Sequence, residues 1–277
     1  MKEKFKDIIG RILVLIRPRK AASLSENGMT ILMNQKLTLS EHLMRNALLK
    51  KADENHEFDT LSKYHRNYWV NRGSDLFALT DDMFENFFLP DWSFIFEILK
   101  VELSKGPNQF KTLVEIGMGN GNVLNYLSSK FDQIDRFVGI DLSVEQVELN
   151  KTRFESNSRL KFVTADGLDW VKSNGKSHMV IVTSGGVLEY FTQERLKEFL
   201  NILNNLGNVI FIAIEPIGIE IDFEKNPNSQ TYGPERSFSH NYRMLFEEAG
   251  FELWHESEKR YPDSDWFFTF VGAKNQA

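Results

Sequence analysis

A glycine-rich segment near the middle of the chain limits the possible folds more than any other feature. It is the run Val114-Glu115-Ile116-Gly117-Met118-Gly119-Asn120-Gly121-Asn122. The run lies where a strand pattern gives way to a helix pattern, and glycines there let the backbone pass close to a bound ligand. The segment therefore predicts a ligand-binding loop at the carboxyl edge of a sheet.

From residue 111 onward, short β-rich runs alternate with helical ones. This alternation predicts a parallel sheet with helices on both faces. The last two strands have no helix between them, only a tight Tyr261-Pro262-Asp263 connection, so we expect an antiparallel hairpin. The expected fold class is α/β, a seven-stranded, mostly parallel sheet with an antiparallel last strand, preceded by a helical N-terminal extension.

The expected strands are Thr112–Ile116, Phe137–Asp141, Leu160–Thr164, Met179–Ser184, Val209–Glu215, Phe251–Glu256 and Trp266–Val271. The expected helices of this part lie around 122–130, 144–155 and 193–205 and at Ser239–Ala249.

Charge and cysteine content exclude several classes of function. The chain has 277 residues, a formal net charge of −6 and no cysteine. A chain without excess basic charge lacks the usual electrostatic basis for binding phosphate backbones, so no nucleic-acid partner is expected. A thiolate nucleophile, a disulfide and a cysteine-ligated zinc ion are all excluded. The histidines show no metal-ligand spacing, and we expect no metal site.

The first 20 residues differ from the rest in charge and pattern. They hold seven basic and two acidic side chains, a net charge of +5, which leaves −11 for the remainder. Apolar residues recur there at the spacing of one helix face, and the apolar run is well short of the roughly 20 residues that span a bilayer. The apolar residues of this face are Phe5, Ile8, Ile9, Ile12, Leu13 and Ile16. Two roles remain open for this basic amphipathic helix: docking on its own domain or on a partner subunit of a homo-oligomer, or reversible contact with a membrane surface.

The glycine loop also indicates which class of cofactor it binds. A dinucleotide fingerprint would place glycine at position 122, but the chain has Asn122, and its glycines fall at 117, 119 and 121. Glu115 puts a negative charge where a phosphate would be repelled and a cationic, amino-acid-bearing cofactor would be attracted. The loop therefore disfavours a pyrophosphate cofactor such as NAD.

These residues resemble the first motif of the class I S-adenosylmethionine-dependent methyltransferases, and the resemblance covers about residues 110–273. Two further motifs match in order: Asp141 in Gly139-Ile140-Asp141-Leu142-Ser143, and Asp166 in Thr164-Ala165-Asp166-Gly167. The resemblance implies that Asp141 binds the ribose hydroxyls and that Asp166 receives the adenine amino group. The full set expected to bind the cofactor is Glu115, Gly117, Met118, Gly119, Asn120, Gly121, Asp141, Leu142, Asp166, Gly167 and Ser184.

The changes of charge and pattern along the chain divide it into three regions. We expect a basic amphipathic helix over 1–22, a helical N-terminal or lid region over 23–110, and the S-adenosylmethionine-binding methyltransferase domain over 111–277. A cytoplasmic location is expected, with membrane association as an alternative that depends on the first helix.

Two side chains are candidates for catalysis, and each has a simpler interpretation. His240 follows a long connection over 216–240 and is the best candidate for a general base, because imidazole titrates near neutral pH. It can equally contact the acceptor without taking a proton, or serve only the structure. Glu189 follows the expected fourth strand, where the family builds its methyl-transfer site, and is either an acceptor-positioning group or a solvated charge. The expected substrate or lid residues are Tyr68, Trp69, Arg72, Tyr232, Arg236 and Tyr242.

The reaction expected from this resemblance is an in-line methyl transfer. The preferred acceptor is a hydroxyl of a small molecule, such as a sugar or glycan precursor, because the usual marks of base methylation are absent from the segment after the fourth strand. The alternatives are a protein or RNA methyltransferase and a catalytically silent, cofactor-binding scaffold.

Overall fold

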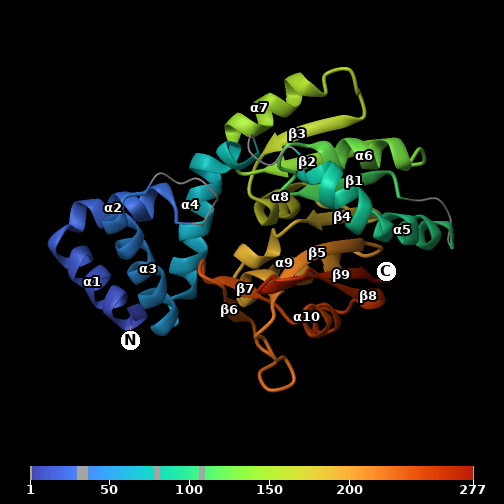
Figure 1. Ribbon diagram of the computed structural model, residues 1–277. Helices are drawn as coiled ribbons and strands as arrows, with labels where there is room; N and C mark the ends of the chain where they lie inside the picture. Colours follow the sequence, from blue (N-terminus) through green and yellow to red (C-terminus); the bar gives the residue numbers. More distant parts are fainter. Residues whose placement is uncertain (1, 30–36, 78–81, 106–109, 277) are drawn as a thin grey trace.

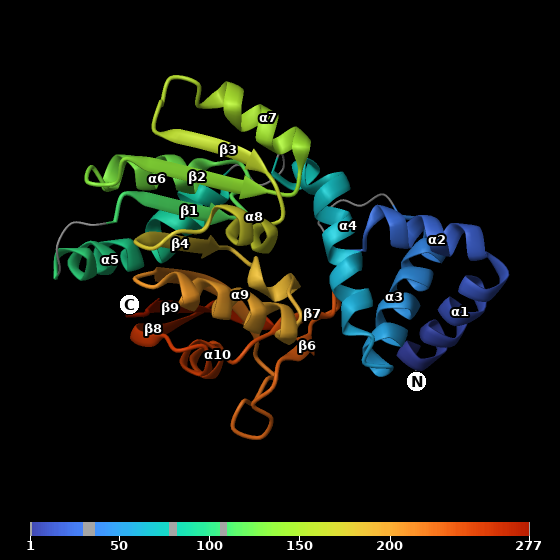
Figure 2. The same ribbon diagram turned by 180° about the vertical axis from the view of Figure 1, so that it is seen from behind.

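The computed structural model describes residues 2–29, 37–77, 82–105 and 110–276. Figures 1 and 2 show a cluster of helices, α1 to α3, at one end of the molecule and the sheet with its covering helices at the other. α4 lies between these two parts in both views.

The α-helices are α1 (Lys2–Ile16), α2 (Pro18–Asn27), α3 (Leu39–Glu54), α4 (Phe58–Phe77), α5 (Phe94–Ser104), α6 (Asn122–Lys130), α7 (Val144–Arg153), α8 (Gly167–Asn174), α9 (Gln193–Leu206) and α10 (Tyr242–Glu248). A π-helix, η1 (Phe84–Trp92), precedes α5, and a 3-10 turn, η2 (Leu188–Tyr190), precedes α9.

A seven-stranded sheet with the order β3-β2-β1-β4-β5-β9-β8 forms the centre of the second part. Its strands are β1 (Thr112–Ile116), β2 (Arg136–Asp141), β3 (Leu160–Thr164), β4 (Met179–Ser184), β5 (Ile210–Gly218), β8 (Glu252–Arg260) and β9 (Trp266–Lys274). The first five strands pair in parallel, while β9 runs antiparallel to both β5 and β8. The predicted fold class, including the antiparallel last strand, is confirmed.

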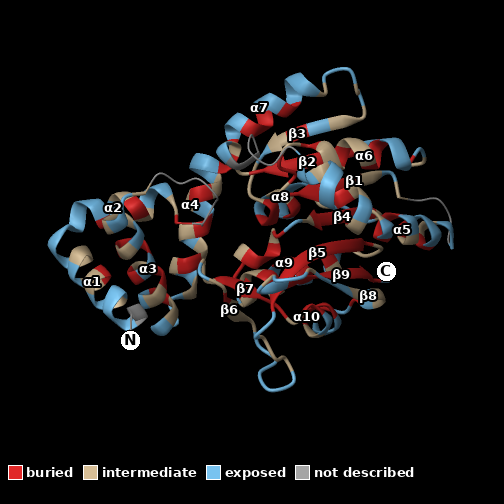
Figure 3. Ribbon diagram, in the orientation of Figure 1, coloured by how far each residue is buried: buried red, intermediate tan, exposed pale blue. Residues whose placement is uncertain are grey.

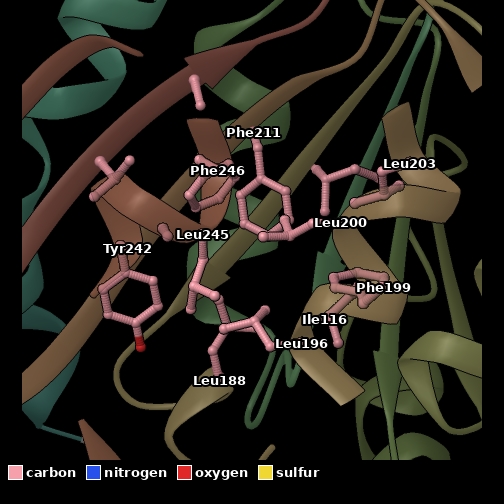
Figure 4. Packing of buried hydrophobic residues seen from close by; sticks show 14 of the residues in the cluster. Ile116, Leu188, Leu196, Phe199, Leu200, Leu203, Phe211, Tyr242, Leu245 and Phe246 are labelled. Atoms are coloured by element: carbon pink, nitrogen blue, oxygen red, sulfur yellow. The ribbon is translucent and has the colours of Figure 1, made fainter. Parts of the chain in front are cut away.

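Alternating side chains of the strands divide the core into two layers. On β5, Phe211 and Ala213 face one layer, whereas Ile212 and Ile214 face the other. The first layer is covered by α8, α9 and α10, and the second by η1, α5, α6 and α7. Figure 3 shows the buried strands between the two layers of helices, and Figure 4 shows Phe211 packed among residues of α9 and α10. Continuous apolar strands of this kind require cover on both faces, which the helices supply.

Short polar side chains fix where several helices begin. Thr38 and Glu41 form a reciprocal capping box at the start of α3. Ser143, Thr192 and Asn241 each accept a hydrogen bond from a backbone N–H in the first turn of α7, α9 and α10. These caps satisfy N–H groups that have no partner within their own helix.

The segment after β5 differs from the sequence-based expectation. A short antiparallel pair, β6 (Gln230–Tyr232) and β7 (Ser237–Ser239), lies within the expected long loop over 216–240. Because Ser239 belongs to β7, it does not cap the following helix as a Ser239–Ala249 helix would require, and α10 begins only at Tyr242. The three-region division at 1–22, 23–110 and 111–277 remains a prediction, and residues 106–109 before its second boundary lie outside the described residues.

Replacement of Phe211 by alanine tests the packing of the core. The Phe211 ring is fully buried, with centroids 6.0 Å from Phe199 and 5.1 Å from Phe246. We expect Phe211→Ala to lower the free energy of unfolding by about 3–5 kcal/mol in chemical denaturation, because a large cavity is left behind. The matched control is Phe5→Ala at an exposed position, which should change it by no more than about 0.5 kcal/mol. Equal effects of the two changes would contradict this account of the core.

Candidate functional site

A cavity of about 260 Å³ opens where the strand order reverses, between β1 and β4 at their carboxyl ends. Such a switch point is the usual ligand site of an open α/β sheet. The cavity is lined by the glycine loop, the ends of β2 and β3, the segment after β4, and residues of α4, η1 and α9. All residues predicted to bind the cofactor line it except Gly121.

The glycine loop curves around this cavity because its glycines adopt positive φ. Gly117 has φ of 70°, and its N–H donates to the carbonyl of Ile140 at 2.8 Å, which ties the loop to β2. The third glycine, Gly121, caps α6 instead of lining the cavity. A side chain there would meet Phe154 and Asn150, so Gly121 permits close packing against α7. Gly117 and Gly119 therefore face the cavity, whereas Gly121 serves the packing of α6 against α7.

Asp141 ends β2 and connects two loops through its carboxylate. Its Oδ2 accepts from the N–H of Gly119 at 3.2 Å, and its Oδ1 accepts from the N–H of Ser143 at 2.9 Å. Burial raises the pKa of this carboxyl to about 6. Asp141 therefore presents a buried acceptor group to the cavity, where hydroxyl donors can bind it.

Glu115 brings a second carboxyl group to the cavity. Its side chain is buried, and burial together with the neighbouring Asp141 raises its pKa well above the ordinary value. Its Oε2 has no hydrogen-bond partner among the described residues. A buried carboxylate with a free oxygen fits a cationic ligand group, since such a group would offset the cost of burying the charge.

Asp166 lies at the cavity but is already engaged. Its Oδ1 accepts from the N–H of Leu168 at 3.0 Å at the start of α8 and forms an ion pair with Arg195 at 2.5 Å. Arg66 from α4 lies 3.8 Å from its Oδ2. The role predicted for Asp166, contact with an adenine amino group, remains a prediction.

Glu215, a residue that the sequence analysis did not select, holds the segment after β4 in place. Its Oε2 accepts from the N–H groups of Val187 and Leu188 at 2.9 and 3.0 Å. Burial raises the pKa of this carboxyl to about 8. The sequence could have indicated this role, because Glu215 ends the expected fifth strand. That strand pairs with β4, which leads into the segment held by Glu215.

Glu189 lies behind the wall of the cavity and contacts a residue that lines it. Its Oε2 accepts from the Tyr232 hydroxyl at 2.6 Å, and its carboxylate also interacts with the hydroxyls of Ser237 and Tyr190. Burial raises the pKa of Glu189 above its ordinary value. Glu189 is buried, so the alternative of a solvated charge is wrong. Tyr190 itself lines the cavity and joins it to this carboxylate.

His240 does not reach the cavity, which corrects its assignment as the general base. The ring is fully buried, its Nε2 lies 2.9 Å from the carbonyl of Leu188, and its Nδ1 lies 2.6 Å from the Ser229 hydroxyl. Burial lowers the pKa of His240 to about 4, so the ring is neutral near pH 7. A neutral imidazole that donates from Nε2 has its only lone pair on Nδ1, which here faces Ser229. His240 is therefore a structural residue.

Among the predicted substrate or lid residues, Trp69 lines the cavity, with its ring centroid 5.6 Å from that of Tyr190. The other five do not line it. Tyr68 packs against Gly28, and Arg72 pairs with Asp75. Tyr232 donates to Glu189, Arg236 pairs with Asp53, and Tyr242 is buried on α10. The described segment 216–240 contributes no residue to the cavity wall.

One wall of the cavity is formed by α4 and η1, which belong to the expected helical or lid region over 23–110; of their residues that line the cavity, only Trp69 was predicted. These elements place aromatic rings opposite the segment after β4, and Trp92 is fixed by donation of its Nε1–H to the Tyr261 hydroxyl at 2.8 Å. The lining residues from α4, η1 and the position before it are Ser62, Arg66, Trp69, Met83, Phe84, Phe88 and Trp92. An apolar wall with a few polar groups is typical of a small-molecule site.

Comparisons with known proteins agree with this site. Residues 113–207 match the family model described as a methyltransferase domain. No curated protein matches the chain. A solved S-adenosylmethionine-dependent methyltransferase from Clostridium acetobutylicum is similar at a TM-score of 0.51 and 13% identity, covering 73% of this chain and 99% of that one. A TehB-like S-adenosylmethionine-dependent methyltransferase from Corynebacterium glutamicum is similar at a TM-score of 0.47 and 16% identity, and the match covers 74% of this chain and 98% of that one. The N-methyltransferase NodS from Bradyrhizobium japonicum, in complex with S-adenosylhomocysteine, has a TM-score of 0.49 and 14% identity, covering 81% and 100%.

The cavity fits the cofactor that the resemblance implies. The unpartnered Glu115 oxygen suits a cationic amino-acid group, the Asp141 carboxylate suits ribose hydroxyls, and the glycine loop leaves space for close backbone contact. The family match, the fold and the composition of the cavity confirm the predicted resemblance and its cofactor, S-adenosylmethionine. The chain therefore contains a methyltransferase domain, matched over residues 113–207, with the fold of the class I S-adenosylmethionine-dependent methyltransferases.

Proposed function

We propose that this methyltransferase transfers a methyl group to a hydroxyl of a small molecule that has an apolar or aromatic-stacking face, such as a sugar or glycan precursor. The proposal rests on Tyr190, which lines the cavity, and on the buried Glu189 carboxylate with which its hydroxyl interacts, because together they supply a potential proton acceptor next to the cavity. A hydroxyl acceptor loses a proton as it is methylated, so such a pair has a clear use.

Residues of the sheet edge would hold the cofactor in this proposal. Glu115 binds the amino-acid part, Asp141 the ribose hydroxyls, and the loop around Gly117 and Gly119 packs against the cofactor; Asp166 faces the adenine. When bound, S-adenosylmethionine supplies an electrophilic methyl group on a sulfonium centre. The protein contributes mainly by orientation, because holding two reactants in attack geometry removes much of the barrier.

The acceptor would lie against the aromatic wall of α4 and η1. Trp69, Trp92 and Phe88 provide flat faces for an aromatic ring or for the apolar face of a sugar. Gly185 and Gly186 both line the cavity with positive φ; the side-chain position of Gly185 faces Trp92, whereas that of Gly186 faces the Glu189 carboxylate. The Glu215 carboxylate keeps the segment after β4 in place by accepting hydrogen bonds from the N–H groups of Val187 and Leu188.

The proton would leave the acceptor through Tyr190. As the oxygen–carbon bond forms and the sulfur–methyl bond breaks, the Tyr190 oxygen would accept the acceptor's proton and pass its own proton to the Glu189 carboxylate. The charges balance, because the sulfonium cation and the carboxylate anion are both neutral afterwards. Tyr232 keeps the Glu189 carboxylate in position through its 2.6 Å hydrogen bond.

Loss of the Asp141 carboxylate should weaken cofactor binding. We expect Asp141→Ala to raise the dissociation constant for S-adenosylmethionine by about 10- to 100-fold in calorimetry, because charge-assisted hydrogen bonds are lost. For the wild type, affinity should fall as the pH decreases through about 6, where Asp141 becomes protonated. Asp132→Ala, at an exposed loop position, is the control and should bind normally. An unchanged constant in the folded Asp141→Ala protein would remove this residue from the site.

Replacement of Tyr190 tests the proton route. Tyr190→Phe and Glu189→Gln should each lower turnover by about 100-fold or more while cofactor affinity stays nearly constant, because proton removal assists only the transition state. Wild-type turnover should decrease in acid as Glu189 is protonated, in a range above the ordinary carboxyl pKa. Tyr126→Phe, outside the cavity wall, is the matched control. Normal turnover in Tyr190→Phe would exclude this route.

The acceptor class is open to a direct screen. Purified protein is incubated with S-adenosylmethionine and panels of sugars, phenols, amines and peptides, and both S-adenosylhomocysteine and the methylated product are detected by mass spectrometry. The proposal expects methyl ethers of small hydroxyl compounds. Methylation of amines or peptides alone would assign a different acceptor, and cofactor binding without any product would support a silent scaffold.

A further inference from the structure

The first helix has two faces, and only one of them has a partner in the structure. The inner face of α1 packs on α3, where the backbone at Gly10 approaches so closely that a Cβ atom would lie 2.2 Å from the Leu43 carbonyl oxygen. Asp7 strengthens this contact through Lys50 at 2.9 Å. Figure 3 shows the opposite face of α1 as exposed, at the end of the molecule away from the sheet.

The outer face of α1 carries a row of large apolar side chains in solvent. They follow one another at helical spacing, and each is between 51% and 78% exposed. The residues of this outer face are Phe5, Ile8, Ile12, Leu15 and Ile16. A contiguous row of this kind is unusual on a surface that only water contacts, so it indicates an interaction surface.

Basic side chains flank the apolar row. Lys4 lies at one end, and Arg17 and Arg19 follow the other end, at the turn into α2. All three are exposed and form no ion pair within the described part of the chain. Asp7, the acidic residue between Phe5 and Ile16, points to the inner face, where it pairs with Arg11 and Lys50. The outer face thus combines apolar area with unopposed positive charge.

We propose that the outer face of α1 is a docking surface for an anionic lipid bilayer, with the helix lying in the plane of the interface. Its apolar row would enter the boundary between headgroups and acyl chains, while Lys4, Arg17 and Arg19 contact anionic headgroups. The remaining chain carries −11 charges and would be repelled by the same surface, which keeps the methyltransferase part directed away from it. This inference is independent of the acceptor proposed above.

The charge pattern favours a membrane over a second copy of the chain. A two-fold interface would place α1 of one copy against α1 of the other, and would bring the two sets of basic residues together. An anionic membrane has the opposite charge and accepts the apolar row at the same time. The helix is also suited to the surface only, since no helix among the described residues has the length and apolar content to cross a membrane.

Vesicle co-sedimentation with the full chain tests this proposal. The vesicles contain phosphatidylcholine with about 30% phosphatidylglycerol, and the buffer contains about 50 mM salt. Ile8→Gln/Leu15→Gln removes apolar contacts, and Lys4→Gln/Arg17→Gln/Arg19→Gln removes charge. The matched control is Val101→Gln/Leu149→Gln, which changes exposed apolar residues of α5 and α7. Cofactor affinity, measured in parallel, verifies that each variant is folded.

We expect the wild type and the control to bind these vesicles, and each α1 variant to bind about 10-fold or more weakly. Binding should also weaken at high salt and on phosphatidylcholine alone. Absence of wild-type binding at low salt, or undiminished binding by the Ile8→Gln/Leu15→Gln protein, would overturn the proposal. A dimer in analytical ultracentrifugation that the same substitutions dissociate, without vesicle binding, would assign the face to self-association.

Discussion

Buried carboxylates hold the backbone of the glycine loop and of the segment after β4 at the carboxyl edge of the sheet. Asp141 on β2 accepts from the N–H of Gly119 and Ser143, and Glu215 on β5 accepts from Val187 and Leu188. Each carboxylate thereby accepts hydrogen bonds from two backbone N–H groups that have no partner in a helix or in the sheet. The shape of the cavity depends on these contacts, because the loops that they fix form two of its sides.

Burial of carboxyl groups at this edge of the sheet has an electrostatic cost. Burial raises the pKa of Asp141 to about 6 and that of Glu215 to about 8, and Glu115 is shifted upward as well. A cationic ligand with hydroxyl donors removes part of this cost, since it supplies the charge and hydrogen bonds that water no longer provides. This complementarity explains why the sheet edge favours a sulfonium-bearing cofactor over a phosphate-bearing one.

The two ends of the molecule have different electrostatic properties. The methyltransferase part is acidic and encloses its ligand between the sheet edge, α4 and η1. The basic end presents α1, whose inner face is fixed on α3 by the close approach at Gly10. α4 contributes to both ends, because Ser62 donates to the carbonyl of Tyr190 at 2.7 Å while residues of the same helix pack against α2 and α3. α4 therefore connects the cavity to α2 and α3, the two helices against which α1 packs.

The sequence by itself determined the strands of the main sheet, their mostly parallel arrangement and the cofactor loop, because apolar periodicity and glycine spacing are local properties of the chain. It also placed Glu115 and Asp141 correctly at the cavity, since the carboxyl ends of parallel strands meet at one edge of the sheet. Only the tertiary structure decided which titratable side chains lie at the cavity wall. Tyr190 lines the cavity while His240 is enclosed behind it, and η1 supplies an aromatic wall that no motif indicated. These outcomes depend on how distant segments pack together, and the sequence pattern of a single segment carries no information about which neighbour will cover it.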